Sequence, residues 1–303
     1  ERLINWLQCM GCTVVIMSAT LPNARRDTIL QAWAGEVPIP VANYPRVSWA
    51  VPGRIDSISF PACRKQILDV RSISADRVVD AAVDMAQQGA RVLMVVNKVA
   101  RAQAIYQAIT DVPCSLFHAR FPMDQRLVIE QCILKQFGPS GNCRTGHVLV
   151  ATQVAEQSLD IDMDVLITDI APVDLILQRA GRIHRHDRKR PDKFRQPCVL
   201  VAGLDQPVPP NYLTSYIYDQ WTVLRSVAWL KNHNSLELPE DIDLAVQQVY
   251  GKADVDGSDQ LLEMIAKAWP AHIQEKKNME MLAQQAALHS PKFWDMKNRT
   301  VVI

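Results

Sequence analysis

Short apolar runs alternate with amphipathic stretches through the middle of the chain, and this alternation limits the possible folds more than any other feature. The runs expected to be strands lie at 91–96, 115–118, 147–151, 165–169 and 198–202. The stretches around them have helical spacing, at 74–88, 98–110, 124–137, near Val154 and at 173–182. Strands that alternate with helices predict an α/β fold with a parallel sheet. Ligands of such sheets bind just after strands, where we expect every polar cluster described below.

The first 35 residues do not follow this alternation. Residues 1–9 and 23–34 have helical patterns, and we expect Asn23 to cap the second helix and Gly35 to end it. The β-branched run 13–17 predicts a strand that is buried on both faces. Because the chain starts without methionine and inside an expected helix, we expect it to be a fragment.

Proline-rich and helical segments flank the central region. Residues 36–63 predict an irregular connector with short strands near 47–51 and 56–60. Beyond Gly203 we expect helices at 212–232, 239–250 and 261–288. Trp221 and Trp229 are expected to anchor the core of this helical part rather than to stack on bases. The predicted segments are therefore 1–45, a linker at 46–73, the α/β domain at 74–204, and a helical region at 205–303.

The overall charge does not favour any one class of partner. The net charge is +1, so attraction to nucleic acid must come from local patches such as the basic stretch 184–195. From Arg188 onward this stretch is either a solvated loop or part of a binding surface. The seven cysteines have no regular spacing, so we expect a reducing, cytoplasmic compartment and place Cys9 and Cys12 in core packing. No apolar run approaches the ~20 residues that span a membrane, and no signal peptide is visible.

A glutamine and two arginines carry the strongest chemical signal. Gln178, Arg182 and Arg185 occur in the pattern Q-x-x-G-R-x-x-R, and in a helix they would share one face. Guanidinium groups bind phosphate oxygens in pairs, so this face suits a polyphosphate. Gly181 would allow close approach of a ligand or a neighbouring backbone. The alternative is a surface helix that carries ion pairs.

Acidic residues follow the strand at 147–151, but we predict no metal site there. Asp160, Asp162 and Asp164 alternate at strand spacing, without the glycine and terminal glutamate of a calcium loop. The dipeptide His186-Asp187 lacks the further ligands that a metal centre needs.

Four clusters in this order resemble the second half of a superfamily 2 DExH helicase motor. They are Ser18-Ala19-Thr20 (motif III), the segment 118–126, the segment 151–162 (motif V) and the segment 178–185 (motif VI). The chain more closely resembles the helicase-nucleases of type I CRISPR systems, which the segments 156–162 and 118–126 favour. It departs from their pattern in having Ala119 for serine and Gln125 between Asp124 and Arg126; Asp124 is expected to cap the next helix.

The resemblance implies a role for each matched position. Arg182 and Arg185 would be arginine fingers, with Gln178 beside them and with Asp160 and Gly181 on the ATP side. Thr152 and Arg120 would face nucleic acid; His118 has either that role or a structural one. Ser18, Ala19, Thr20, Glu156 and Gln157 would couple nucleotide state to movement.

The resemblance also implies a fold, cofactors and partners. Residues 1–45 would end a first RecA-like domain, and 74–204 would form the second. The family moves 3′ to 5′ on single-stranded DNA with ATP and Mg²⁺, together with a nuclease domain and the Cascade surveillance complex with its crRNA. This sequence contains no phosphate loop and no DExH motif, so the Mg²⁺ ligands would come from upstream and the fragment alone should be inactive. Alternatives are another DNA or RNA helicase of the DExH type, or a RecA-like binding scaffold without activity.

Overall fold

The central strands are buried along their whole length, because helices and loops cover both faces of the sheet that they form. The computed structural model describes residues 2–62, 64–143, 146–157, 159–210, 213 and 217–286, with the side chains of Gln157 and Ala286 outside this description. Every residue of β4 (Arg91–Val95), β6 (His147–Ala151) and β7 (Val165–Asp169) is buried. Such runs are typical of parallel sheets with two covered faces.

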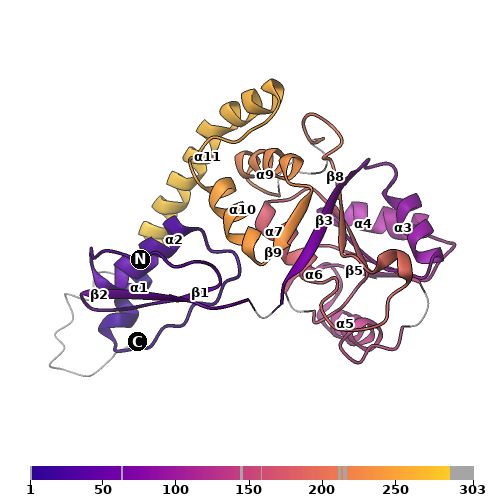
Figure 1. The fold of residues 1–303 in the computed structure, drawn as a ribbon, viewed down its shortest axis with the longest axis horizontal. Coiled ribbons are helices and arrows are strands. Elements are labelled where there is room, and N and C mark those ends of the chain that lie inside the picture. Colours follow the sequence, from indigo (N-terminus) through magenta and orange to yellow (C-terminus); the bar gives the residue numbers. More distant parts are fainter. Residues whose placement is uncertain are drawn as a thin grey trace. The chain divides into compact units, whose positions relative to one another are not determined.

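The sheet has seven strands in the order β5-β6-β4-β7-β8-β3-β9 (Figure 1). The outer members are β5 (Cys114–Phe117), β8 (Cys198–Ala202), β3 (Gln66–Ile73) and β9 (Ser235–Leu238). All neighbours are parallel except β9, which runs antiparallel to β3. The predicted RecA-like α/β sheet is therefore confirmed.

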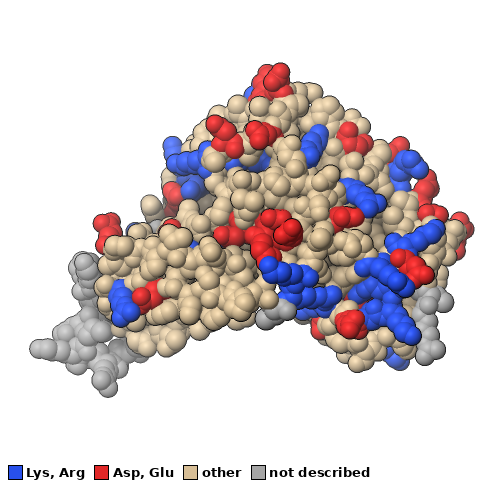
Figure 2. All heavy atoms as spheres, in the orientation of Figure 1, with Lys and Arg blue, Asp and Glu red and all other residues tan. Residues whose placement is uncertain are grey.

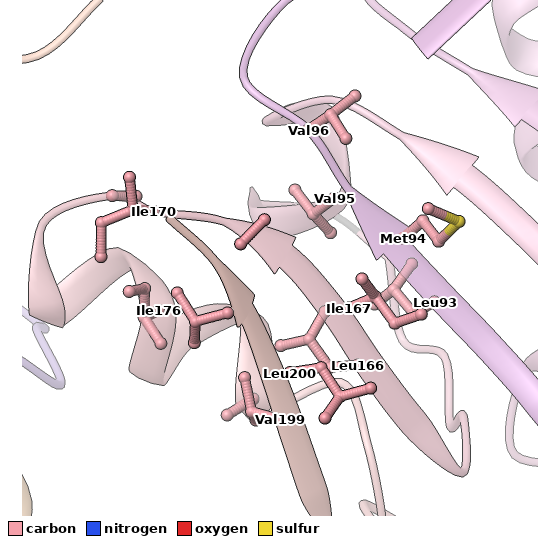
Figure 3. Packing of buried hydrophobic residues seen from close by; sticks show 14 of the residues in the cluster. Leu93, Met94, Val95, Val96, Leu166, Ile167, Ile170, Ile176, Val199 and Leu200 are labelled. Atoms are coloured by element: carbon pink, nitrogen blue, oxygen red, sulfur yellow. The ribbon is translucent and has the colours of Figure 1, made fainter. Parts of the chain in front are cut away.

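Helices connect the strands and close the core around them. They are α3 (Val78–Gln87), α4 (Val99–Ala108), α5 (Met123–Phe137), α6 (Val154–Gln157), α7 (Val173–Ala180), the 3₁₀ helix η1 (Asp192–Phe194), α9 (Gln220–Asn232) and α10 (Glu240–Tyr250). Figure 3 shows the packing of β4, β7 and β8 through side chains such as Leu93, Ile167 and Leu200. Register pairs such as Met94↔Ile167 bring these strands together.

Two strands of the sheet were not predicted. Residues 66–73, part of the expected linker, form β3 between β8 and β9. Its sequence carries Asp69 and Arg71, and its exposure is mixed, so no local pattern marks it. Backbone pairing with β8, more than 120 residues away, makes this segment a strand.

The chain divides into two compact units, and the α/β unit described above is Arg64–Trp269. The second, the hairpin unit, contains the described residues of Glu1–Cys63 and Pro270–Ile303. Its elements are α1 (Arg2–Cys9), α2 (Asn23–Ala34), β1 (Arg46–Val51) and β2 (Arg54–Ser59). The strands expected near 47–51 and 56–60 are confirmed as this antiparallel hairpin.

Three predictions for the hairpin unit were wrong. Residues 13–17 form no strand, and Val15 and Met17 are 78% and 89% exposed. A β-branched run becomes a strand only when neighbours accept its backbone hydrogen bonds, and no described residue pairs with it in a strand. Cys9 and Cys12 are exposed rather than in core packing. The N-cap of α2 is Pro22, and the Asn23 side chain instead accepts a 2.8 Å hydrogen bond from Arg46 Nη2.

The helical character expected beyond residue 205 is largely confirmed. Helix α9 begins at Gln220, where the Asp219 carboxylate accepts the Thr222 N–H at 2.9 Å. Residues 212 and 214–216 of the predicted helix lie outside the described part. Trp221 and Trp229 are buried, as expected of core anchors. Helix α11 (Asp259–Ala286) contains Pro270, and no helix among the described residues is long and apolar enough to cross a membrane.

Candidate functional site

Polar residues from four neighbouring strands meet at the carboxyl edge of the sheet. Asn97 follows β4, His118 follows β5, Thr152 follows β6, and Asp169 ends β7. The Thr152 N–H donates to the Phe117 carbonyl at 3.2 Å, which places Thr152 beside His118. The Asn97 N–H donates to Asp169 Oδ2 at 3.0 Å. This edge is therefore a connected polar cluster, as expected for parallel sheets.

His118 is the least satisfied polar group at this edge. Its ring stacks on Phe121 with centroids 4.2 Å apart, and the residue is 4% exposed. Neither ring nitrogen has a hydrogen-bond partner among the described residues. Burial lowers the pKa of His118, and the nearby Arg120 charge lowers it further. Arg120 itself is exposed, whereas Thr152 is 2% exposed.

Helix α5, which follows this segment, is not capped as predicted. It begins at Met123, and its N-cap residue is Pro122, with no side-chain hydrogen bond. Asp124 instead lies inside the first turn, where a carboxylate still interacts favourably with the helix dipole. Figure 2 shows Lys and Arg side chains gathered on this face of the α/β unit, over the region of β5 and α5.

The two predicted arginine fingers lie at the opposite, amino edge of the sheet. Helix α7 starts after the carboxyl end of β7 and ends at Ala180, so it returns the chain toward the start of β7. There Ile183 bridges to Met163, and the Asp164 N–H donates to the carbonyl of Arg91, the first residue of β4. The expectation that every cluster follows a strand was therefore wrong for this one.

Gln178, Arg182 and Arg185 do not share a helix face. Gln178 is half-buried within α7, but the chain leaves the helix at Gly181 and tightens into 3₁₀-type turns, with Arg182 N–H bonded to the Arg179 carbonyl at 3.0 Å. Gly181 has φ −63°, and a Cβ there would meet nothing closer than 3.2 Å. Among the described residues, no segment outside its own turn approaches Gly181 closely, and the approach of a ligand stays a prediction.

The side chains of Arg182 and Arg185 are held differently. Arg182 donates to two carbonyl oxygens of α6, at 3.2 Å to Ala155 and more closely to Glu156. Burial and the charge of Arg185 lower the pKa of Arg182. Arg185 is 41% exposed and pairs with the half-exposed Asp160 at 2.7 Å. Among the described residues, no carboxylate is bonded to Arg182, while the Arg185 pair is open to solvent.

A hollow of about 210 Å³ lies beside this pair. It is lined by Arg64, Gln66, Gly181, Ile183, His184, Arg185, Leu238 and Pro239. Arg64 Nη1 donates to the Arg185 carbonyl oxygen at 3.2 Å, so a further cation reaches the same place. Arg64 was not predicted, because it lies outside every motif.

Two arginines of the basic stretch 184–195, Arg188 and Arg190, are paired with carboxylates rather than solvated. Arg190 donates to both oxygens of Asp162 at 2.8 Å and to Asp164 at 2.5 Å. Arg188 pairs with Asp162 at 2.5 Å, and Arg91 binds Asp164 at 2.6 Å. Although burial raises the pKa of Asp164, the hydrogen bonds from Arg91 outweigh it and hold the pKa below its usual range. Arginines thus occupy these carboxylates, and the described residues contain no group of side chains suited to a metal ion.

Arg179 lies between two predicted site residues but was not itself predicted from the sequence. Its side chain is fully buried, and Nε donates to Glu156 Oε1 at 2.7 Å. The predicted coupling residue Glu156 is thus joined to motif VI. The only signal in the sequence is that Arg179 interrupts the apolar face of α7, which contacts the sheet.

The remaining predicted coupling residues give less information. Ser18, Ala19 and Thr20 belong to the hairpin unit, where the Thr20 N–H donates to Ser18 Oγ at 3.3 Å. The side chain of Gln157 lies outside the described part of the chain. Their roles, like those of the arginines above, stay predictions.

Comparison with known proteins gives one consistent family. Residues 88–188 match the family model for the C-terminal part of the CRISPR-associated nuclease/helicase Cas3. A CRISPR-associated endonuclease/helicase Cas3 of Thermus thermophilus is 30% identical over 92% of this chain and 36% of its own length. The Escherichia coli protein of the same description is 34% identical over 82% of this chain and 30% of its own. The chain thus spans about a third of the length of these relatives.

Solved structures agree with the sequence matches. A crystal structure of a CRISPR-associated protein has a TM-score of 0.84 at 35% identity and covers 93% of this chain and 34% of its own. T. fusca Cas3 with AMPPNP has a TM-score of 0.80 at 28% identity, with 96% of this chain and 36% of its own covered. A CRISPR RNA-guided surveillance complex in a pre-nicking state contains a chain with a TM-score of 0.79 at 28% identity, with coverage of 96% and 39%.

Proposed function

Because this chain belongs to the CRISPR-associated Cas3 family, we propose that it is the C-terminal motor part of an ATP-driven helicase-nuclease. The intact protein would move 3′ to 5′ along single-stranded DNA in the cytoplasm. It would act on target DNA opened by the Cascade surveillance complex with its crRNA, as the similarity to a chain of such a complex supports. The alternatives are another DExH-type helicase or a RecA-like scaffold without activity.

The observation that carries this proposal is the pair of arginines at the amino edge. Within the described part of the chain, Arg182 is bonded to neutral carbonyl oxygens alone, and the carboxylate partner of Arg185 is half-exposed. An exposed ion pair contributes little, so Arg185 can exchange Asp160 for a phosphate oxygen at small cost. The pKa of Arg182 is lowered because burial and repulsion by Arg185 disfavour its charged guanidinium. A bound anion would offset both effects.

The residues present therefore fit the γ-phosphate end of ATP, the group that AMPPNP mimics in T. fusca Cas3. Bound ATP supplies the phosphoryl group and its negative charge. Arg182 and Arg185 would stabilise the charge that develops on that group, while Asp160, Gly181 and Gln178 would line the same cleft. The sequence contains neither a phosphate loop nor a DExH motif, so both would be supplied by other parts of the whole protein, together with the Mg²⁺ ligands. We propose that the chain needs those parts for ATP hydrolysis.

Nucleic acid would bind at the carboxyl edge. Arg120 is exposed there and can contact a backbone phosphate, whereas Thr152 and His118 lie just beneath the surface. Backbone contacts of this kind are independent of sequence and weaken with salt. The two ligands would thus occupy opposite edges of one sheet, with α6 and α7 between them.

The test is ATP hydrolysis by the full-length protein with and without single-stranded DNA. Arg182→Ala and Arg185→Ala are each expected to lower DNA-stimulated kcat about 10³-fold, the usual effect of losing an arginine finger. Arg195→Ala is the matched control, because Arg195 lies in the same basic stretch and its pair with Asp192 is exposed. Hydrolysis that is absent in the wild type, or equal in all variants, would favour the scaffold alternative. Stimulation by RNA rather than DNA would favour another DExH helicase.

A further inference from the structure

Arg179 makes hydrogen bonds with its whole guanidinium group inside the α/β unit. An arginine has five N–H donors, and Arg179 uses all five. Nε donates to Glu156, and Nη1 to Thr168 Oγ1 and the Asp169 carbonyl at 2.7 and 3.1 Å. Nη2 donates to Tyr218 Oη and Asn97 Oδ1 at 2.9 and 3.3 Å. These acceptors come from α6, from β7, from the end of β4 and from the segment before α9.

The partners of Arg179 also contact one another at the carboxyl edge. Gln153 Nε2 donates to the Asn97 carbonyl at 3.1 Å and to Tyr218 Oη at 3.3 Å. Tyr218 Oη in turn donates to Asn97 Oδ1 at 3.3 Å. Gln153 follows Thr152, the residue expected on the nucleic-acid side. The Arg179 guanidinium therefore fits only when all four segments are in place.

Helix α6 connects this cluster to Arg182. The Ala155 N–H donates to the Thr152 carbonyl at 3.1 Å, so α6 starts at the carboxyl edge. The carbonyls of Ala155 and Glu156, at the other side of the same turn, accept the Arg182 guanidinium. Glu156 thus accepts hydrogen bonds from two arginines: its carboxylate accepts one from Arg179, and its backbone carbonyl accepts one from Arg182. A shift of α6 must move both arginines.

We propose that Arg179 is a positioning residue that links the carboxyl edge to Arg182 through α6, so that nucleic-acid binding at one edge sets the arginine finger at the other. This inference rests on the proposed function. It adds Arg179, Asn97 and Tyr218 to the machinery, although none of them was expected to touch ATP or DNA. The link requires the planar guanidinium group with its five donors, because a lysine ammonium has only three donors and no fixed plane.

The experiment measures the stimulation ratio, which is kcat at saturating single-stranded oligo-dT divided by kcat without DNA, in the full-length protein. Arg179→Lys keeps the charge but loses the fork, and the ratio is expected to fall about ten- to a hundredfold, as for a misplaced reacting group. The KM for ATP and the half-saturating DNA concentration should stay within about twofold, because both binding surfaces remain.

Arg225→Lys is the matched control. Arg225 is also buried in the α/β unit and donates to the carbonyls of Val249, Gln248 and Ala253, away from the Arg179 cluster. Its substitution should leave the stimulation ratio unchanged. If Arg179→Lys lowers hydrolysis equally with and without DNA, as a purely structural change would, the proposal is overturned.

Tyr218→Phe keeps the test decisive if Arg179→Lys does not fold. It removes one hydroxyl and is expected to lower the ratio a few-fold; an unchanged ratio contradicts the proposal. Because both changes act through one link, the double variant should be no worse than Arg179→Lys alone. Failure of the proposed function looks different: the wild type would show no stimulation, or Arg182→Ala would leave hydrolysis unchanged.

Discussion

Buried charges in the α/β unit are each matched by specific partners. Arg179 donates to Glu156 and four neutral acceptors, and Asp164 receives Arg91 and Arg190. Removing one member of such a buried pair leaves an uncompensated charge, so these residues tolerate substitution poorly. By contrast, Arg185 and Asp160 are half-exposed and free to exchange partners. A rigidly held arginine, Arg179, and one that can exchange its partner, Arg185, thus lie within seven residues of each other.

His184 makes the stability of this region depend on pH. It has φ 49°, is 6% exposed, and its Nε2–H donates to the Asp164 carbonyl at 3.1 Å. Burial, followed by the charge of Arg190, lowers its pKa from 6.5 to about 4. The folded state thus binds fewer protons than the unfolded state, so this contribution to stability is complete above pH 6.5 and is lost as pH falls toward 4.

The check is urea unfolding between pH 7 and 4 for the wild type and His184→Asn, since asparagine tolerates positive φ. The free energy of unfolding of the wild type should fall more steeply over this range. Asp164, whose pKa is also shifted, is common to both proteins. Parallel curves would mean that His184 does not titrate as inferred.

At the level of elements, close packing between helices and strands decides where glycine is needed. Gly146 precedes β6, and a Cβ there would lie 1.6 Å from the Ala86 carbonyl oxygen of α3. Backbone cannot yield as a flexible side chain can, so either α3 or β6 must shift. At Gly181, at the end of α7, the nearest atom to such a Cβ is the Gln178 carbonyl oxygen at 3.2 Å.

Gly146→Ala is therefore expected to lower the free energy of unfolding by about 3 kcal/mol, as overpacking does. Gly181→Ala should change it by less than about 1 kcal/mol, because its φ suits any residue. Denaturant unfolding of the two variants provides the comparison. Equal effects would contradict the packing argument. A loss of hydrolysis in Gly181→Ala alone would support its place on the ATP side.

For the whole molecule, the two units differ in how much core they contain. The α/β unit has one continuous core across seven strands, whereas the buried cluster of the hairpin unit consists of Leu30, Ala34 and Ile55. A unit with a small core buries a smaller share of its surface on folding and opens more readily.

Hydrogen exchange should therefore separate the units. Amides of β4 and β7 are expected to exchange only by global opening of the α/β unit, and those of β1 and β2 much faster. Mass spectrometry of peptides from the chain would show this difference. Similar protection of β1 and β4 would mean that the hairpin unit is stabilised by more than its own described core.

Local patterns were enough to predict the central sheet and the order of the motifs. β4, β6 and β7 are continuous apolar runs, and such runs report burial on both faces wherever they occur. Motifs V and VI specify residue types at fixed spacing, so the family resemblance followed from them directly. The short hairpin of the first unit was also visible between prolines.

What tertiary structure decided depends on partners far away in the chain. β3 is a strand because β8 pairs with it, and residues 13–17 are not, because no described segment does so. The position of Arg182 at the amino edge follows from where α7 ends, and the burial of Arg179 from acceptors on four separate segments. A sequence pattern records what a residue prefers; hydrogen bonds between distant segments determine which charges are buried and which remain free to bind.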